Sequence, residues 1–426
     1  MPETEHTRPL ALLTHTAKWL LLACAVAALA GTASAAFLFA LDWATETRSA
    51  NRWLIWLLPL AGFAVGWVYW RFGQSVEAGN NLLIDEIHDP KRVVPLRLAP
   101  MILGGTVLSH LFGASVGREG TAVQMGGALA DQLTHLCRLD RADRRTILMA
   151  GIAAGFASVF GTPLAGAVFA LEVLALGRLR ADAFMPCVVA AVVADQVGQM
   201  WGVHHTHYAT GSLPAIGIWP LLAVAGAGAV FGLTGQAFAK ATHAVSGFMK
   251  RHIAYPPLRP LLGGTLVACA VWAVGTDRYI GLGIPTIVDA FAQPLPAWDF
   301  LGKLAFTIAS LGSGFKGGEV TPLFYIGATL GNALAPVLNL PIGMLAGIGL
   351  VAVFAGASNT PIACTLMAME LFGPGIGVFA GVACAMSYVC SGHAGIYHAQ
   401  RVSHLKTGQP TATNKENSLK VNTEKR

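Results

Sequence analysis

Residues 154–165 read AGFASVFGTPLA and residues 353–363 read VFAGASNTPIA, so one apolar pattern with a Thr-Pro step occurs twice in the chain. Each copy continues to an acidic residue, Glu172 in the first and Glu370 in the second. The two Thr-Pro steps and the two acidic residues are both 198 positions apart. Equal offsets of this kind indicate an internal repeat of about half the chain.

The repeat extends upstream and its copies differ in charge. Residues 117–121 (GREGT) and 317–321 (GGEVT), which are 200 positions apart, both open a Gly-rich apolar stretch. No Lys or Arg lies between Lys316 and Arg401 around the second copy. The first copy is bracketed by arginines, namely Arg138, Arg141, Arg144, Arg145, Arg178 and Arg180. Because basic residues favour the cytoplasmic side, this asymmetry predicts an inverted-topology repeat, in which broken helices meet near the midplane of a membrane.

The composition places the chain in a membrane. Hydrophobic residues make up 54% and charged residues 12%, whereas an ordinary soluble domain carries about 25% charge. Spans of about 20 apolar residues cross a bilayer as helix. We expect spans near residues 10–41, 53–70, 184–201 and 216–238, the first being retained because it is too long for a signal peptide. The seven cysteines have no metal or disulfide spacing, and the net charge of +6 reflects topology, so no nucleic acid is expected.

The basic cluster gives a topology. We expect both ends of the stretch from Ile147 to Leu176 to be cytoplasmic, with a turn at residues 161–163, so each limb has about 14 residues or roughly 21 Å of helix. The polar tail is expected to be cytoplasmic and disordered. The predicted divisions are N-terminal membrane helices (1–71), the first repeat (72–202), a junction (203–300), the second repeat (301–400) and the tail (401–426).

Glu119 is the residue predicted to carry the chemistry. It lies in a glycine-flanked turn before a helix that Thr121 is placed to cap. A helix N-terminus attracts anions, and it can hold either a halide or the Glu119 carboxylate. Protonation of Glu119 would weaken its hold, so proton binding and anion occupancy would compete. The plainer alternative is a buried bridge between Glu119 and Arg118, although we expect Arg118 to point away from the pore.

Four segments, in order, resemble the CLC family of anion transporters. Residues 117–120 (GREG) resemble the segment with the gating glutamate, and residues 79–82 (GNNL) lie where CLC proteins usually have Gly-Ser-Gly-Ile-Pro. Residues 318–322 (GEVTP) lie where they have Gly-x-Phe-x-Pro, and residues 395–397 (GIY) resemble the segment with the anion-binding tyrosine. The resemblance implies an all-α membrane fold of two inverted repeats of tilted and broken helices, and a homodimer with one pathway per subunit.

The departures resemble the fluoride-exporting branch of that family, a fluoride/proton antiporter clade. Asn80 replaces the usual serine, Thr121 the proline after the gate, and Val320 the phenylalanine, while Glu319 and Thr321 appear in the second anion-site loop. The resemblance implies a set of functional residues: Glu119 for gating and proton coupling; Gly79, Asn80, Val320, Thr321 and Tyr397 for anion binding; Glu319 for a proton path; and Gly117, Arg118, Gly120 and Thr121 for the gate loop.

Fluoride accepts strong hydrogen bonds, which the Asn80 amide and the Thr321 and Tyr397 hydroxyls can supply. Chloride/proton exchangers carry two adjacent acids where this chain has Glu172 and Val173, so the usual inner proton acceptor is missing. Two simpler roles remain open, a helix cap for Asn80 and an interfacial tyrosine for Tyr397. We expect fluoride and protons as substrates, lipid and a second copy as partners, no cofactor or metal, and a multi-pass cytoplasmic (inner) membrane location that gives fluoride resistance.

Other readings of the sequence also stay open. A chloride or nitrate exchanger and a passive anion channel would share the fold. Ser313 and His393 are the residue types of intramembrane proteases, a remote enzyme alternative. The histidine-rich segment 204–207 is expected to be a solvated loop, and Glu172 and Glu370 are expected to be structural, binding backbone N–H groups or arginines. We expect Asp131, Asp195 and Lys316 to be buried as well.

Overall fold

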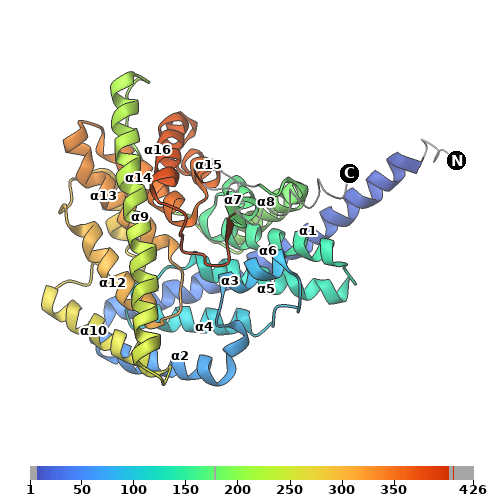
Figure 1. The fold of residues 1–426 in the computed structure, drawn as a ribbon, viewed down its shortest axis with the longest axis horizontal. Helices are drawn as coiled ribbons and strands as arrows, with labels where there is room; N and C mark the ends of the chain where they lie inside the picture. The colour runs from blue at the N-terminus through green and yellow to red at the C-terminus, as the bar shows by residue number, and fades with distance from the viewer. Residues whose placement is uncertain (1–6, 177–178, 403–405, 407–426) are drawn as a thin grey trace, which may run out of the picture.

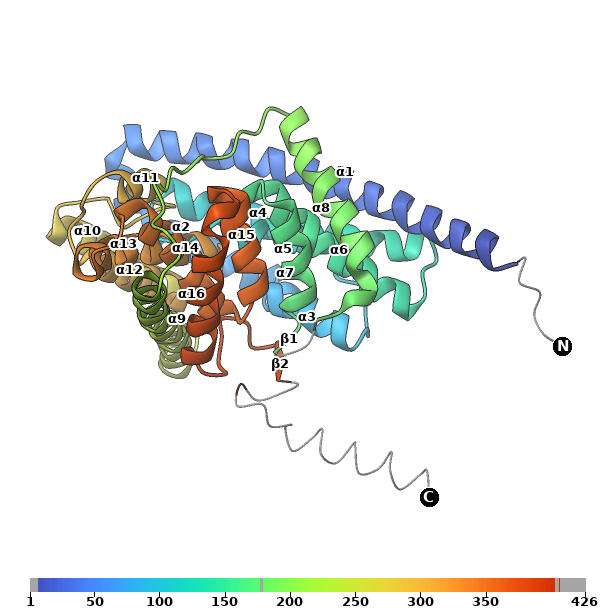
Figure 2. The same cartoon turned by 90° about the horizontal axis from the view of Figure 1, so that it is seen from above.

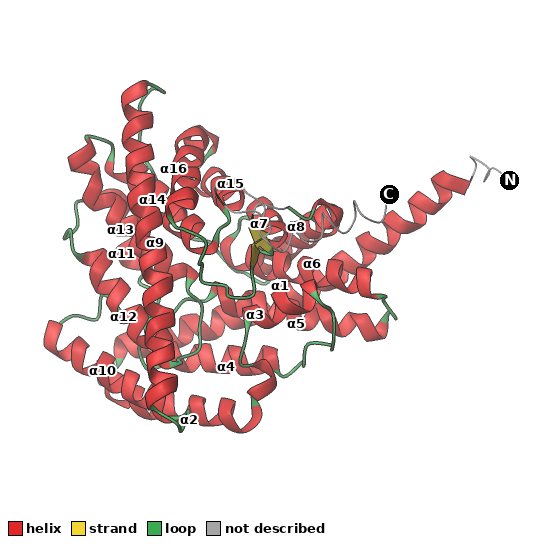
Figure 3. Cartoon of the chain, viewed as in Figure 1, coloured by secondary structure: helices red, strands yellow, loops and turns green. Residues whose placement is uncertain are grey.

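The computed structural model describes residues 7–176, 179–402 and 406, and these are almost entirely helical (Figures 1 and 3). The first half of the chain holds α1 (Thr7–Ala50), α2 (Leu58–Phe72), α3 (Asn80–His88), α4 (Leu98–Leu111), α5 (Glu119–Leu136), α6 (Arg141–Phe160), α7 (Pro163–Glu172) and α8 (Phe184–Met200). The second half holds α9 (Ile218–His252), α10 (Leu258–Val274), α11 (Ile284–Ala292), α12 (Asp299–Ser313), α13 (Val320–Leu338), α14 (Ile342–Ser358), α15 (Pro361–Phe372) and α16 (Gly377–Cys390). Two short strands, β1 (Ala175–Leu176) and β2 (Arg401–Val402), pair in parallel.

Five helical segments in the described part are long and apolar enough to cross a membrane. They are Leu12–Ala50, Arg52–Phe72, Ala181–Met200, Ile218–His252 and Val320–Leu338. The first four confirm the expected spans. The fifth is interrupted in sequence by polar residues that the fold buries, among them Asn332, whose amide donates to the carbonyls of Ala290 and Gln293 at 2.8 Å.

The turn predicted at residues 161–163 is present, because α6 is followed by Gly161 in the left-handed region (φ +69°) and α7 begins with Pro163. The same break recurs in the second half, where α14 is followed by Asn359 with φ +58° and α15 begins with Pro361. Each Thr-Pro step therefore divides one apolar stretch into two antiparallel helices. The limbs are unequal rather than about 14 residues each, because α6 has 20 residues and α7 has 10, while α14 has 17 and α15 has 12.

Glycines allow the helices of each repeat to touch. A Cβ on Gly126 of α5 would lie 2.3 Å from the carbonyl oxygen of Gly151 on α6. In the second half a Cβ on Gly327 of α13 would lie 2.1 Å from the carbonyl oxygen of Gly349 on α14. Such close backbone approach requires small residues, as in many membrane helix pairs, and its presence in both halves confirms the repeat.

The two copies contact each other through matching elements that run in opposite directions. Gly117 and Gly318 form an antiparallel bridge, with N–H groups donating to carbonyls at 2.6 and 2.8 Å. The Glu370 carboxylate accepts from the N–H groups of Leu164 and Ala165 at 2.9 and 2.8 Å. The last residue of α7, Glu172, does the same for α15. Glu172 and Glu370 are thus structural, as expected, and they bind backbone rather than arginines.

The equivalent bonds of Glu172 go to Ile362 and Ala363 at 3.0 and 2.8 Å. Each carboxylate satisfies N–H groups that the start of a helix leaves without intrahelical partners. The helices α7 and α15 lie side by side (Figure 1), so this reciprocal capping joins the halves where they meet.

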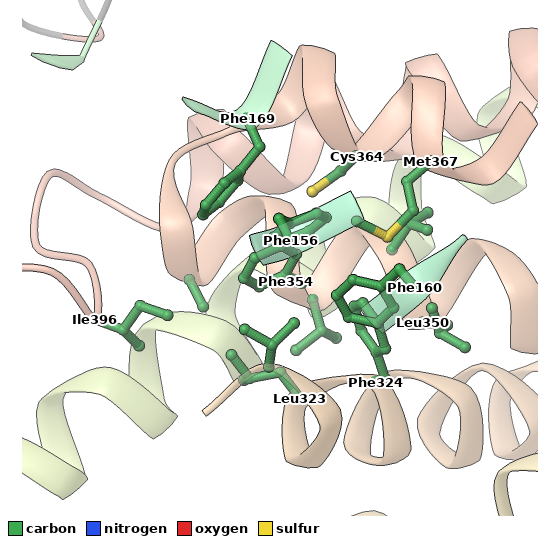
Figure 4. Packing of buried hydrophobic residues seen from close by; sticks show 14 of the residues in the cluster. Phe156, Phe160, Phe169, Leu323, Phe324, Leu350, Phe354, Cys364, Met367 and Ile396 are labelled. Atoms are coloured by element: carbon green, nitrogen blue, oxygen red, sulfur yellow. The ribbon is translucent and has the colours of Figure 1, made fainter. Parts of the chain in front are cut away.

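Aromatic side chains from α6, α7, α13 and α14 pack together in the core (Figure 4). Phe156 stacks on Phe169 with ring centroids 4.5 Å apart, and Phe169 stacks on Phe354 at 5.9 Å. Phe160 and Phe324 approach to 5.1 Å. Because Phe156 and Phe160 come from α6 whereas Phe324 and Phe354 come from the second copy, the core is shared by the two halves.

The basic cluster predicted as a loop lies mostly in the first turns of α6, which buried ion pairs fix. Arg144 donates to Asp131 at 2.8 Å and to Glu86 at 2.9 Å, and its side chain is 7% exposed. Arg401 N–H donates to the carbonyl of Leu174, which joins β2 to β1 beside the start of α6. We call this side of the molecule the β2 face (Figure 2). The expected tail therefore begins with an ordered strand, and most of residues 403–426 lie outside the described part.

Candidate functional site

Glu119 lies at the point where the two repeats converge. It is the first residue of α5, and its side chain is 1% exposed. Its carboxylate accepts from the backbone N–H of Thr321 at 3.0 Å, and Thr321 Oγ1 donates to the two carboxylate oxygens at 2.6 and 2.5 Å. Thr321 is the second residue of α13, so Glu119 occupies the N-terminal end of a helix from the opposite repeat.

Arg118 does not point away from this position, and that prediction is wrong. Its Nε lies 3.5 Å from Glu119 Oε1, and its backbone N–H donates to Glu119 Oε2 at 3.2 Å. The bridge between Arg118 and Glu119 is therefore present, but it coexists with the contacts to Thr321. Because 17% of the Arg118 side chain is exposed, the guanidinium remains in contact with a cavity while one edge faces Glu119.

The predicted cap by Thr121 is also wrong. The helix α5 begins two residues earlier, at Glu119, and no side chain caps it. Thr121 is buried, and its hydroxyl lies 2.7 Å from the hydroxyl of Thr106 on α4. The Thr121 hydroxyl therefore bonds to a neighbouring helix instead of to the backbone at the start of α5.

Asn80 faces the gate loop. It begins α3 after Gly79, whose φ of +56° favours glycine, and no side chain caps this helix, so the capping alternative is wrong. A Cβ on Gly120 would lie 3.1 Å from Asn80 Nδ2. Asn80 Oδ1 is buried without a hydrogen-bond partner in the described part of the chain. Because Gly120 has no side chain, the Asn80 amide can lie directly against the gate loop.

Glu319 reaches the same place from the second repeat. A Cβ on Gly120 would lie 3.9 Å from Glu319 Oε2 and 3.1 Å from the Cα of Gly318. Val320, which follows Glu319, is buried at the start of α13. The gate-loop glycine is thus bordered by an amide, a carboxylate and backbone drawn from both halves, and the structure brings these predicted residues together.

A cavity of about 740 Å³ opens on the β2 face. Its walls include Gly79, Asn80, Glu319 and Tyr397. Tyr397 is 7% exposed and its ring meets Phe169 edge-on at 6.4 Å. The aromatic core thus supports the ring of Tyr397, which also forms part of the cavity wall.

Two further cavities lie beyond Glu119. A small one of about 20 Å³ is lined by Arg118, Glu119, Thr321 and apolar side chains. A larger one, of about 860 Å³, is also lined by Arg118 and includes Arg48 and Arg278. We call the side of this larger cavity the opposite face. Glu119 therefore stands between the β2-face cavity, reached past Asn80 and Glu319, and the small cavity leading to the opposite face.

The loop 204–207 contributes a residue that sequence reasoning missed. His205 lines the small cavity next to Glu119, and its Nε2 lies 3.2 Å from Asp195 Oδ1. The expectation of a solvated loop holds for the exposed His204 and His207 but is wrong for His205, whose side chain is 16% exposed. No local pattern marks His205, because its partner comes from α8 and the cavity is formed by distant segments.

Ser313 and His393, the residues of the protease alternative, do not bond to each other. Ser313 donates to the carbonyl of Ser310 at 3.0 Å within α12, and His393 accepts from the N–H of Lys406 at 3.0 Å. These bonds do not form a serine–histidine dyad. Val173, in place of a second acid after Glu172, is buried at 2% exposure.

The chain is similar to proteins of one family along most of its length. The model of the family described as "Voltage gated chloride channel" matches residues 61–392. A Pseudomonas syringae pv. tomato protein described as "Chloride/fluoride channel protein" is 66% identical over 416 residues, which is 96% of this chain and 92% of that protein.

Two solved structures share the architecture. The crystal structure of a CLC-type fluoride/proton antiporter superposes with a TM-score of 0.88 at 34% identity, covering 94% of this chain and 100% of the other. A slow cyanobacterial Cl⁻/H⁺ antiporter superposes with a TM-score of 0.75 at 19% identity, covering 88% and 94%, and that likeness supports the fold alone.

Proposed function

The chain belongs to the voltage gated chloride channel (CLC) family, and from this premise we propose that it exports fluoride across the cytoplasmic membrane in exchange for protons. The family and the fold make it a membrane ion transporter rather than an enzyme. The relative that is 66% identical is described as a chloride/fluoride channel protein. The solved structure with a TM-score of 0.88 is described as a fluoride/proton antiporter. Both descriptions support fluoride as the exported ion.

One observation carries the mechanism: the Glu119 carboxylate rests on the N-terminus of α13, bound by the N–H and hydroxyl of Thr321. Those donors suit any small anion. A fluoride ion can take them only when Glu119 leaves, and protonation removes the charge that holds Glu119 there. Anion and proton thereby exclude each other at one position, which couples their movements in opposite directions.

Fluoride must exchange its water for protein donors along this route. In our proposal the Asn80 amide and the Tyr397 hydroxyl supply donors on the side of the β2-face cavity, and Thr321 supplies them at the gate. Glu319 borders Gly120 between these positions and provides a proton acceptor that Val173 does not. The gate-loop glycines Gly117 and Gly120 let the backbone of the two repeats approach closely enough for this path.

We further propose that the β2 face is cytoplasmic. It holds the arginine-rich start of α6 around Arg144, and Lys250 and Arg259 line its cavity, which fits the preference of basic residues for the cytoplasmic side. The exposed apolar side chains of α7, α15 and α16, such as Leu164, Ile362 and Val389, would contact lipid and a second copy in a homodimer.

The alternatives are a chloride or nitrate exchanger and a passive anion channel of the same fold. Purified protein in liposomes loaded with equal fluoride or chloride distinguishes the ions, and we expect fluoride efflux to exceed chloride efflux. Equal rates would contradict fluoride specificity. A pH gradient imposed on vesicles with equal fluoride inside and outside should drive fluoride uphill, and its failure to do so would indicate a channel.

A further inference from the structure

Lys316 is a basic residue in the wall of the β2-face cavity. It has no role in the proposed exchange of fluoride for protons. It lies in the loop between α12 and α13, three residues before Glu319, and it lines the β2-face cavity. Its Nζ is 4.1 Å from the centroid of the Tyr69 ring on α2. None of the ion pairs within 4.0 Å formed by the described residues involves Lys316. Lys316 is therefore a cavity-wall residue whose ammonium lies beside an aromatic face and outside those ion pairs.

The surrounding backbone fixes this orientation. A Cβ on Gly105 of α4 would lie 3.0 Å from Lys316 Cβ, so the side chain of Lys316 rests directly on that helix. On one side Phe315 is buried at 5% exposure, and on the other a Cβ on Gly317 would lie 2.5 Å from Val116. With both neighbours packed and its own Cβ against α4, Lys316 has a fixed backbone position in the cavity wall, and its ammonium lies over the Tyr69 ring.

The charges of this cavity favour anions. The cationic side chains in its wall are Lys250, Arg259 and Lys316, and the acidic ones are Glu77 and Glu319. Arg259 donates its Nε to the carbonyl of Ile253 at 3.0 Å, so part of its hydrogen-bonding capacity serves the α9–α10 loop. A cavity with low-dielectric walls and an excess of one charge concentrates ions of the other sign. Lys316 is the cation of this wall closest in sequence to the anion-site loop.

We propose that Lys316 recruits small hydrated anions into the β2-face cavity, at a position that precedes the site formed by Asn80 and Tyr397. The inference rests on the proposed function, since it assigns the first contact of the exported ion. An ammonium is a compact, strongly hydrated point charge, so it attracts fluoride and chloride alike. Lys316 therefore sets how readily an anion enters, whereas the later donors set which anion proceeds.

The test measures initial efflux against internal anion concentration in liposomes for Lys316→Gln, Lys316→Arg and the parent protein. One unit charge at about 4 Å in water corresponds to about a fivefold change in local concentration. We expect Lys316→Gln to raise the half-saturating fluoride and chloride concentrations by about fivefold, with the maximal rate and the fluoride-to-chloride ratio unchanged. Lys316→Arg should behave like the parent. Arg48→Gln, which removes one charge from the opposite-face cavity, should leave the half-saturating concentration unchanged when the β2 face faces the loaded lumen.

A cysteine variant separates charge from shape. Lys316→Cys is treated in detergent, before reconstitution, with a thiol reagent that adds a trimethylammonium group or one that adds a sulfonate. The cationic adduct should restore the parent's half-saturating concentration and the anionic adduct should raise it further. Parent protein treated likewise controls for its exposed Cys24, Cys137 and Cys269. Parent fluoride flux with no effect of Lys316→Gln, or equal effects of both adducts, would overturn the inference, whereas a parent that moves no fluoride would overturn the proposed function instead.

Discussion

Glu119→Gln is the substitution that tests the gate most directly. The carboxylate of Glu119 accepts from three donors: the Thr321 N–H, the Thr321 hydroxyl and the Arg118 N–H. Hydrogen bonds to charged groups contribute about 1.5–3 kcal/mol and neutral ones about 0.5–1.5 kcal/mol. The neutral amide therefore loses roughly 1 kcal/mol per donor, or roughly 3 kcal/mol in all, by the same comparison.

This loss has two consequences for transport. At about 1.4 kcal/mol per factor of ten, a fluoride ion should displace the glutamine amide of the variant about a hundredfold more readily than it displaces the carboxylate. The amide also has no carboxyl proton to exchange at physiological pH. We therefore expect the variant to move fluoride down its gradient without moving protons.

The assay records fluoride efflux with an ion-selective electrode and luminal pH with a trapped dye in the same proteoliposomes. The parent should acidify the lumen in proportion to fluoride efflux, because each fluoride that leaves is exchanged for protons that enter. Glu119→Gln should show fluoride efflux with a flat pH trace. Persistent proton movement in Glu119→Gln, at the parent's ratio of protons to fluoride, would refute the competition at this position. Glu370→Gln serves as the matched control, since it neutralises a partly buried carboxylate that caps α7 and makes no hydrogen bond to Glu119 or Thr321.

Three other substitutions report on the site and on the scaffold. Asn80→Ser should raise the ratio of chloride to fluoride efflux by about three- to tenfold, because it removes one amide donor worth about 0.5–1.5 kcal/mol. The liposome assay measures this ratio, and an unchanged ratio would show that Asn80 does not contribute to anion selectivity. Arg144→Ala should lower the free energy of unfolding by about 3–5 kcal/mol, because it leaves the Asp131 carboxylate buried without its cation; thermal unfolding in detergent measures this, and a parent-like melting curve would contradict it. Glu370→Ala should cost about 0.5–2 kcal/mol, as the loss of a helix cap does, with fluoride selectivity preserved; the same melting assay applies, and a changed selectivity would give Glu370 a role in transport.

Features repeated in the sequence were the ones that could be predicted. The Thr-Pro steps carry their own geometry, because proline begins a helix and cannot continue one, so the breaks before Pro163 and Pro361 follow from the residues alone. The equal offsets then gave the pairing of the halves, and the arginines gave their opposite orientations. The convergence of Glu119, Asn80 and Glu319 followed from the family resemblance.

Side-chain partners were less predictable. Thr121 and Arg118 occupy positions where local rules favour a cap and an outward arginine, but each found a closer partner in the packed structure: Thr106 for the first and Glu119 for the second. His205 was missed for the same reason, since Asp195 on α8 draws it toward the small cavity. Contacts across the fold decide these orientations, and a single sequence holds no record of them.

The reciprocal bonds of Glu172 and Glu370 make the two halves depend on each other. Without its partner, each half would leave the N–H groups at the start of one short helix without these acceptors. Because one chain carries both halves, the two caps are always present in equal number, and neither half has to find its complement by diffusion.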